Sequence, residues 1–589
     1  MKRYITKTIL ATAVIAAAFP AFAQEKEEKD LSKTIVVEKE FVPVEVKVTK
    51  PATSPAEFTQ KVAPVNLTYS DWALPTAFDP VMVQQSPIIY KDESLEYNRK
   101  RGYFDFAGGN YANIFGRLGY RILDSEKTKL GVWLKHDSSN GNIYKDIDKD
   151  VTDDNKKHDK QNYLSEKIGI DFANTFSKGT LNASLVYNFN KFNYVDIVKS
   201  FYDKDDQKAN NFGLNLGWNN DSKELQYNIG ATINYFGFDK DYWVATTDKG
   251  AKEFELGLNG GIRQVFGENS YAGVDIAFQY LNQKNLCYQS LLATEEILSG
   301  EIVANPHSKS FGMFSITPNY SKATDKMNLR IGARLDISFN NGTTFRIAPD
   351  VKFDYKLCDI AAVSLSAVGG NKINTFHNAF DENRYINPSY GLPTTYTLVD
   401  ATAAIKLGLF KGFYAYPFVG GAVTKHSAVN YIPTSLYQYH ILKDMDMNGF
   451  KAGLELGYKY GTFVETAVKY TFTPQGLDYG YIYSNDCAEH NVDASIKVTP
   501  IKRLNIGLSY QLRAQRTQRY EHRLPDGTSF DRSRNLENIS NLNASASYGI
   551  FDWLTVFCQA NNLLGREYTT YYGFPAQKFN ILAGVGLNF

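Results

Sequence analysis

Aromatic residues stand in the long polar stretches of this chain, and their chemistry points most directly to a ligand. Rings with Asn and Asp nearby suit glycans, peptides or hydrophobic small molecules, because the rings offer apolar faces while amides and carboxylates form hydrogen bonds. The alternative is an aromatic girdle, in which Tyr and Trp lie half in water at a membrane surface. We expect the girdle at the bases of loops and ligand contacts only at their tips. The candidate ligand contacts are Tyr242, Trp243, Tyr385, Tyr390, Tyr481 and Tyr571.

The acidic residues, histidines, serines and cysteines give little indication of a metal site or a catalytic site. Asp146, Asp148 and Asp150 carry carboxylates at every second position, a spacing that can wrap a calcium ion. The glycine of an EF-hand loop is missing, so the sequence favours a solvated acidic loop. The eight histidines show no H-x-x-x-H spacing, and no G-x-S-x-G element is present. Four cysteines allow three disulfide pairings that the sequence does not distinguish, and Cys558, on an apolar face, is expected to be unpaired. We predict no cofactor and no metal site.

Residues 1–23 have the pattern of a secretory signal peptide. Lys2 and Arg3 precede an apolar run, and Ala21 and Ala23 form an A-x-A cleavage site before Gln24. Beyond residue 23 no run of about 18 apolar residues follows, so the sequence predicts no transmembrane helix. The formal net charge of +1 argues against nucleic acid as a partner. These features leave two classes, a secreted all-β protein and an outer-membrane β-barrel.

Short segments of alternating polarity lie between the long polar stretches and must position the aromatic side chains of those stretches. Leu181, Ala183 and Leu185 face one way, for example, while Asn182 and Ser184 face the other. The even number of 22 segments is what a single-chain bacterial barrel requires. The predicted strands are 102–109, 112–123, 129–138, 163–176, 181–195, 210–220, 224–237, 252–265, 271–283, 309–320, 327–338, 345–357, 360–372, 396–410, 413–425, 446–459, 463–473, 490–499, 503–516, 536–549, 553–564 and 577–589.

The lengths of the connections alternate along the chain. Tight turns such as 124–128 and 177–180 interleave with long polar stretches. Those stretches are 139–162, 196–209, 238–251, 284–308, 373–395, 426–445, 474–489, 517–535 and 565–576. Short periplasmic turns and long extracellular loops are typical of transmembrane barrels. The predicted fold is therefore all-β, a transmembrane antiparallel β-barrel of about 22 strands.

The C-terminal segment carries a family resemblance. In residues 577–589 apolar and polar residues alternate, and the strand ends on Phe589, as the closing strands of outer-membrane barrels do. With the stretch before it, this strand resembles the C-terminus of TonB-dependent outer-membrane receptors. Residues 102–111 also resemble the first hairpin of that family's barrel, which the resemblance implies has 22 strands. The matching C-terminal residues are Asn562, Leu563, Tyr568, Gly573, Pro575 and Phe589.

The N-terminal region departs from this family. Residues 24–100, rich in Pro, Lys and Glu, are about half of what the family's globular plug needs, so the chain resembles a plug-truncated relative with a short plug or a tether. Thr34, Ile35, Val36 and Val37 resemble the TonB box, and residues 24–60 are the candidate contact for TonB or another periplasmic protein. A barrel of this width would be an open hole, so we expect the N-terminal segment, inward-folded loops or a partner to occlude it.

The sequence thus predicts a signal peptide (1–23), a periplasmic segment (24–100) and an outer-membrane barrel (101–589) of a Gram-negative cell. We expect a receptor-like barrel that binds a solute at the cell surface or passes it across the outer membrane. The first alternative is a structural or assembly barrel that anchors partner proteins. An outer-membrane enzyme is the less favoured second alternative. The lipid bilayer is an expected partner, as is the barrel-assembly machinery through the C-terminal strand. The solute and the energy coupling stay open.

Overall fold

The computed structural model describes residues 100–144, 158–194, 206–220, 222, 224–240, 250–267, 269–287, 306–340, 343–386, 394–410, 412–431, 441–474, 488–523, 529–571 and 573–589. The signal peptide, the TonB-box-like residues and the acidic loop at Asp146 therefore lie outside the described residues. So do Tyr242, Trp243, Tyr390 and Tyr481. In the described part of the chain, no helix has both the length and the apolar character to cross a membrane.

The described chain is almost entirely β-strand, with one short helix. The strands are β1 (Gly102–Gly109), β2 (Ile114–Asp124), β3 (Thr128–Tyr144), β4 (His158–Phe176), β5 (Gly179–Phe192), β6 (Gln207–Asn220), β7 (Leu225–Phe238), β8 (Lys252–Phe266), β9 (Ser270–Cys287), β10 (Pro306–Ala323), β11 (Met327–Phe339), β12 (Phe345–Cys358), β13 (Ala361–Lys372), β14 (Thr395–Phe410), β15 (Phe413–Tyr431), β16 (Ile441–Tyr460), β17 (Val464–Phe472), β18 (Ala488–Ile501), β19 (Leu504–Arg523), β20 (Ser529–Leu536), β21 (Ile539–Phe551), β22 (Leu554–Asn561), β23 (Thr569–Tyr571), β24 (Phe574–Pro575) and β25 (Asn580–Asn588). The helix, α4, covers Phe376–Glu382.

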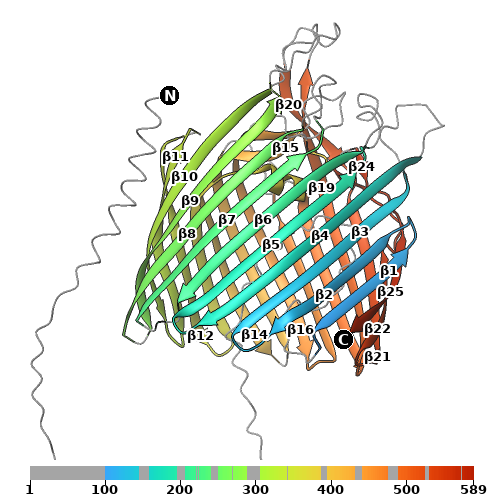
Figure 1. The fold of residues 1–589 in the computed structure, drawn as a ribbon, viewed down its shortest axis with the longest axis horizontal. Coiled ribbons are helices and arrows are strands. Elements are labelled where there is room, and N and C mark those ends of the chain that lie inside the picture. Colours follow the sequence, from blue (N-terminus) through green and yellow to red (C-terminus); the bar gives the residue numbers. More distant parts are fainter. Residues whose placement is uncertain are drawn as a thin grey trace, which may run out of the picture. The chain divides into compact units, whose positions relative to one another are not determined.

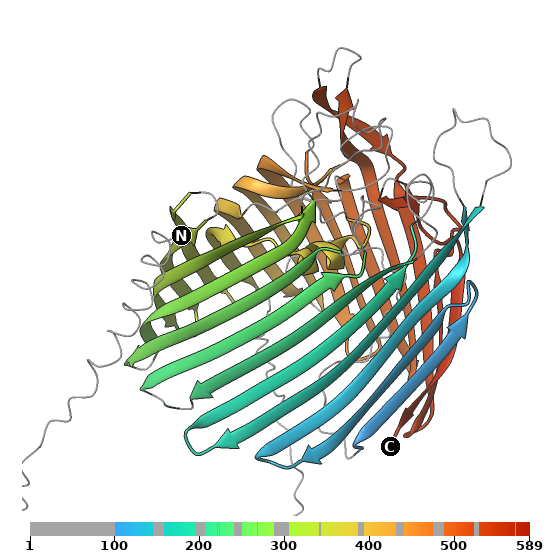
Figure 2. The same cartoon turned by 45° about the horizontal axis from the view of Figure 1, so that its top comes forward.

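These strands close into an antiparallel barrel, shown in Figure 1 and, turned, in Figure 2. From β1 to β20 each strand pairs with the next one in sequence, β22 pairs with β21 and β25, and β25 pairs with β1 to close the ring. Gly102 and Phe589 exchange two backbone hydrogen bonds, of 2.7 and 2.9 Å, at this seam. The sheet holds 23 strands, but β20 and β21 pair with successive parts of β19 and share one position, which leaves 22 around the barrel. Closure removes the unpaired edges that an open sheet would expose.

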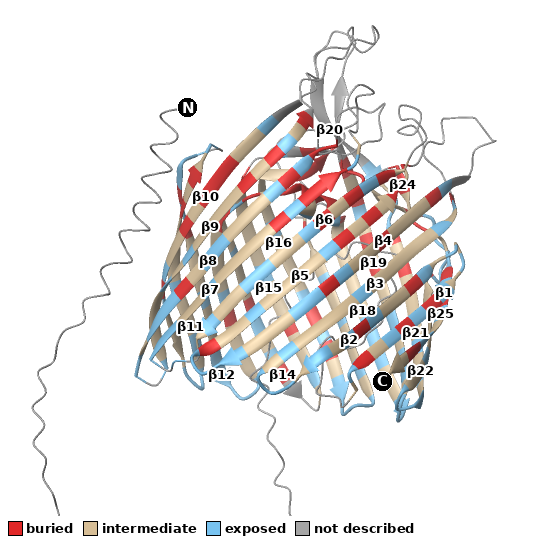
Figure 3. Ribbon diagram, viewed as in Figure 1, coloured by how far each residue is buried: buried red, intermediate tan, exposed pale blue. Residues whose placement is uncertain are grey.

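Buried, half-buried and exposed residues are interspersed along the strands of the wall (Figure 3). Outward-facing apolar side chains such as Phe106, Leu258 and Ile262 are exposed, as lipid-facing residues of a barrel must be. Charged side chains pair on the inner face. Arg330 donates to Asp350 over 2.7 Å and to Asp275 over 2.9 Å. A polar interior behind an apolar outer face is typical of a barrel with a wet lumen.

All 22 predicted strands are present, and the differences gather at one end of the barrel. We call this the long-loop end, because the long connections lie there, and the opposite end the short-turn end. At the long-loop end β3 continues to Tyr144, β16 begins at Ile441, and β19 continues to Arg523. In the sequence of these extensions polar residues no longer alternate with apolar ones, so the period-2 signal disappears. The stretch 517–535, predicted as a loop, is for this reason largely a ribbon of β19 and β20. Cys358 and Cys558 are free, as expected for Cys558.

Candidate functional site

The connection between β13 and β14 turns into the barrel at its long-loop end. We call residues 373–394 the inner loop, of which 387–393 lie outside the described residues. Its helix α4 lies inside the ring of strands (Figure 2). Thr375 caps the helix by accepting a hydrogen bond from the Asn378 amide, and the Asn383 amide donates to the Ala379 carbonyl at the other end. A helix of 7 residues is too short to be stable alone, so its contacts with the wall must hold it.

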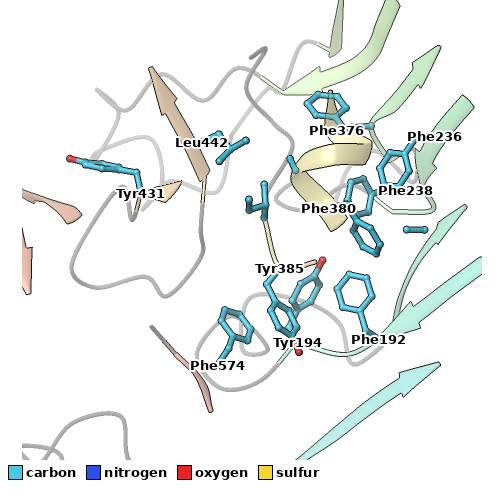
Figure 4. Close-up of a cluster of buried hydrophobic side chains, with 14 of the residues drawn as sticks. Phe192, Tyr194, Phe236, Phe238, Phe376, Phe380, Tyr385, Tyr431, Leu442 and Phe574 are labelled. Carbon is cyan, nitrogen blue, oxygen red and sulfur yellow. The ribbon is translucent and has the colours of Figure 1, made fainter. Parts of the chain in front are cut away.

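Apolar contacts hold one side of α4 to the wall (Figure 4). The ring of Phe380 lies 5.8 Å from that of Phe192 on β5, and 5.4 and 5.7 Å from Phe236 and Phe238 on β7, measured between centroids. Full burial of one such side chain contributes about 1.5–3 kcal/mol. These residues belong to what we call the lumen cluster. Its members are Ile143, Phe192, Tyr194, Ala209, Phe236, Phe238, Ala251, Leu286, Phe376, Ala379, Phe380, Tyr385, Ile386, Tyr431, Leu442 and Phe574.

A buried carboxylate on β8 fixes the start of the same helix. Glu253 is only 2% exposed, and it accepts hydrogen bonds from the Phe376 amide and from Gln283 on β9, each 2.8 Å long. Burying a carboxyl group costs free energy, and these two hydrogen bonds offset part of that cost. The His377 ring lies 2.8 Å from Asn211 on β6 and 3.2 Å from Asn234 on β7, between nitrogen atoms. Burial lowers the pKa of His377, against the opposing effect of Asp381.

The connection between β22 and β25 meets the inner loop inside the barrel. We call residues 562–579 the closing connection, and the two segments together the cover. Phe574 stacks on Tyr385 with centroids 3.8 Å apart and planes 10° apart. The Tyr571 hydroxyl donates to the Glu382 carbonyl over 2.5 Å. Tyr385 also accepts a hydrogen bond of 2.8 Å from Gln161 on β4, and its burial raises the pKa of the phenol.

Two side chains shape the closing connection from its base. Asn562 has a φ of +48°, and its amide nitrogen donates to the carbonyls of Arg566 and Gln577 over 2.8 and 3.2 Å. The guanidinium of Arg516, 1% exposed, donates to the carbonyls of Thr569 and Thr570 over 2.8 and 2.7 Å. These bonds set the backbone path that carries Tyr571 and Phe574 into the lumen.

The remaining residues of the C-terminal motif lie on the same connection or at the barrel seam. Tyr568 is buried, and burial raises its pKa to about 12. Gly573 has a φ of +83°, a conformation that side chains disfavour. Pro575 lies in β24, Leu563 is exposed, and Phe589 stacks on Tyr120 of β2.

Of the six candidate ligand contacts, Tyr385 and Tyr571 are described, and the structure brings both into the cover. Neither lies at a free loop tip, which was the expected place. Sequence reasoning missed Glu253, His377 and Phe380, because their partners come from distant strands. One signal was available: Phe376 and Phe380 stand four residues apart in a polar stretch, the spacing of one helix face.

A polar hollow lies between the cover and the wall formed by β3, β4 and β5. It encloses about 1250 Å³, counting space open to solvent. Amides line it from the wall, and charged residues line it from both sides. Its polar lining includes Lys135, Asp137, Gln161, Lys167, Asn188, Asn190, Asp381, Glu382, Asn383 and Arg384. Among the described residues no three His, Cys, Asp or Glu side chains are grouped so as to hold a metal ion.

Solved outer-membrane receptors share this architecture at low sequence identity. The siderophore receptor PirA from Acinetobacter baumannii aligns with a TM-score of 0.62 and 9% identity, over 84% of this chain and 81% of that one. The ferripyoverdine receptor of Pseudomonas aeruginosa, bound to ferripyoverdine, gives 0.56 and 13%, over 83% and 72%. The copper transporter OprC gives 0.58 and 10%, over 83% and 81%. No family model and no curated protein matches the sequence. The chain therefore has the barrel fold of TonB-dependent receptors, as its C-terminal motif predicted.

Proposed function

We propose that this chain is a receptor-like barrel of the outer membrane that binds a polar solute at its long-loop end and passes it through the lumen. The observation that carries this proposal is the cover, because two connections of the chain itself fold inward and dock on the wall. The wall holds these connections in one position through Glu253, Gln161 and Phe236. The cover therefore narrows the long-loop end of the barrel in one defined arrangement. Defined closure suits a barrel that regulates passage.

The charged inner face supports the same function. Arg330, Asp275 and Asp350 form hydrogen-bonded pairs along the wall, as do Arg117 and Asp105 across β1 and β2. Such residues keep water in the lumen, and a polar solute can exchange its hydration for contacts with them. We also propose that the chain resides in the outer membrane, uses the barrel-assembly machinery through β25, and lacks enzymatic activity.

Single-channel conductance of the refolded mature chain in a planar bilayer tests this function. The comparison is a variant in which a short Gly-Ser linker replaces residues 375–393. We expect little conductance from the mature chain and a clear increase from the variant, because α4 and the residues after it no longer occupy part of the lumen. Equal conductance from both proteins would contradict the role of the cover. A further variant without residues 24–95 measures separately what the N-terminal segment contributes, including a plug or a TonB contact.

The structural or assembly role makes a different prediction for the same measurement. A barrel that only anchors partner proteins should stay silent even without the inner loop and without residues 24–95. Silence of the variant that lacks both segments would therefore favour an anchor, and the search should turn to proteins that co-purify with the chain.

A further inference from the structure

One residue that lines the polar hollow, Asn383, carries a buried side-chain donor without a hydrogen-bond partner among the described residues. Asn383 is 2% exposed, and its side-chain oxygen accepts a hydrogen bond of 3.0 Å from the Tyr385 amide. Its side-chain nitrogen is buried and has no hydrogen-bond partner. A buried donor without a partner costs free energy, and native proteins tolerate few of them. Because Asn383 lines the hollow, a bound molecule with an oxygen acceptor could satisfy this nitrogen.

The charges around the hollow cancel. Three cationic side chains and three acidic side chains line it, so a solute of either net charge gains little from long-range attraction. One cation is also held against a ring, since the Arg384 guanidinium lies 3.7 Å from the centroid of Tyr163. The six charged residues are Lys135, Lys167, Arg384, Asp137, Asp381 and Glu382.

Amide and hydroxyl groups make up the rest of the polar lining. Gln161, Asn188 and Asn190 line the hollow from the wall, and Asn383 lines it from the inner loop. Each amide presents both a donor and an acceptor, which matches a hydroxyl group, itself both donor and acceptor. Tyr163 and Tyr571, also in the lining, are partly exposed and add aromatic surface. Amides with aromatic surface and no net charge fit a sugar ring better than a charged chelate.

We propose that the hollow binds a neutral, hydroxyl-rich solute, an uncharged oligosaccharide. This inference rests on the proposed function, for which it names the class of solute. The solute lies between the wall and both parts of the cover, so its binding is coupled to the position of the cover. Wall residues such as Asn190 then select the solute without themselves holding the inner loop.

Calorimetric titration of the detergent-solubilised full chain tests the proposal. The probes are maltohexaose, cellohexaose and mannohexaose, with tetra-alanine as a zwitterionic peptide and ferric citrate as an anionic chelate. We expect at least one oligosaccharide to bind and neither charged probe to do so. Asn190→Ala should weaken that binding by about tenfold, because one hydrogen bond is lost. The control is Asn541→Ala, a buried amide on β21 outside the hollow, which should leave binding within about twofold.

The outcomes separate this proposal from the proposed function. Binding of tetra-alanine or ferric citrate alone, or of none of the five probes, overturns the solute class. If the variant without the inner loop conducts in that case, the proposed passage of a solute is supported, and only the oligosaccharide as its solute is rejected. If an oligosaccharide binds but no variant conducts, the site stands and passage fails. Equal weakening by Asn190→Ala and Asn541→Ala would overturn the location, provided that both variants keep the heat-resistant gel migration of a folded barrel.

Discussion

Tyr385 and Phe574 stack almost parallel, with ring centroids 3.8 Å apart, and this contact joins two connections that leave the barrel wall at different places. Tyr385 follows α4 in the inner loop, while Phe574 lies on the closing connection after β22. Both rings are buried in the lumen cluster, so their contact stabilises the association of the inner loop with the closing connection.

The first prediction concerns this contact. Phe574→Ala removes a buried ring, a change that costs about 3–5 kcal/mol in a protein core. The two parts of the cover should separate, and single-channel recordings should show larger or more frequent openings than the unaltered chain does. Phe413→Ala is the control, because Phe413 contacts Tyr458 on the exposed outer wall, with ring centroids 4.3 Å apart and planes tilted by 35°. Equal recordings from both variants would show that the stack does not hold the cover.

The second prediction concerns the buried carboxylate of Glu253. Glu253→Leu leaves the Phe376 amide and Gln283 without their acceptor, at a cost of about 1–3 kcal/mol for each donor. The inner loop should leave the wall more often, so trypsin should cut after Arg384 at least about tenfold faster. Mass spectrometry of the fragments measures this rate. Glu455→Gln alters a buried carboxylate on β16 and should not change the cutting rate.

The third prediction concerns Arg516. Its guanidinium donates to the carbonyls of Glu537, Thr569 and Thr570, and the ammonium of a lysine cannot reproduce this planar geometry. Arg516→Lys should therefore speed amide hydrogen exchange in residues 566–578. Arg513→Lys, which affects a pair with Asp493 on the neighbouring strand, should leave exchange in that segment unchanged. Unchanged exchange in the Arg516 variant would mean that other contacts hold the closing connection.

The fourth prediction tests which face of the wall meets lipid. Leu258 points outward in the middle of β8 and is 45% exposed, while the next residue, Asn259, points into the lumen. Leu258→Lys should destabilise the folded barrel by about 2–4 kcal/mol near the middle of a bilayer, whereas Asn259→Lys should be tolerated. Urea unfolding in lipid vesicles measures both. A larger loss from Asn259→Lys would reverse the assignment of the faces.

The sequence predicted the wall well, because alternation is a local signal that each strand carries by itself. Leu181, Ala183 and Leu185 are enough to define one face of β5 without reference to any other strand. The cover was not predictable in the same way. Its contacts join Glu253 to Phe376 and Tyr385 to Phe574, pairs that only the closed barrel brings together. The inner loop was anticipated in general terms, as one of three candidates for occlusion. The hollow depends on that docked loop and could not be located beforehand.

Both parts of the cover are joined at each end to wall strands, the inner loop to β13 and β14 and the closing connection to β22 and β25. A separate plug domain could leave the lumen as one body, but these segments stay attached to the wall at both ends. The aperture that they uncover has an upper bound set by the slack of the backbone. Under the proposed function, the size limit of the barrel should depend on the lengths of these two connections, and lengthening either connection should admit larger molecules.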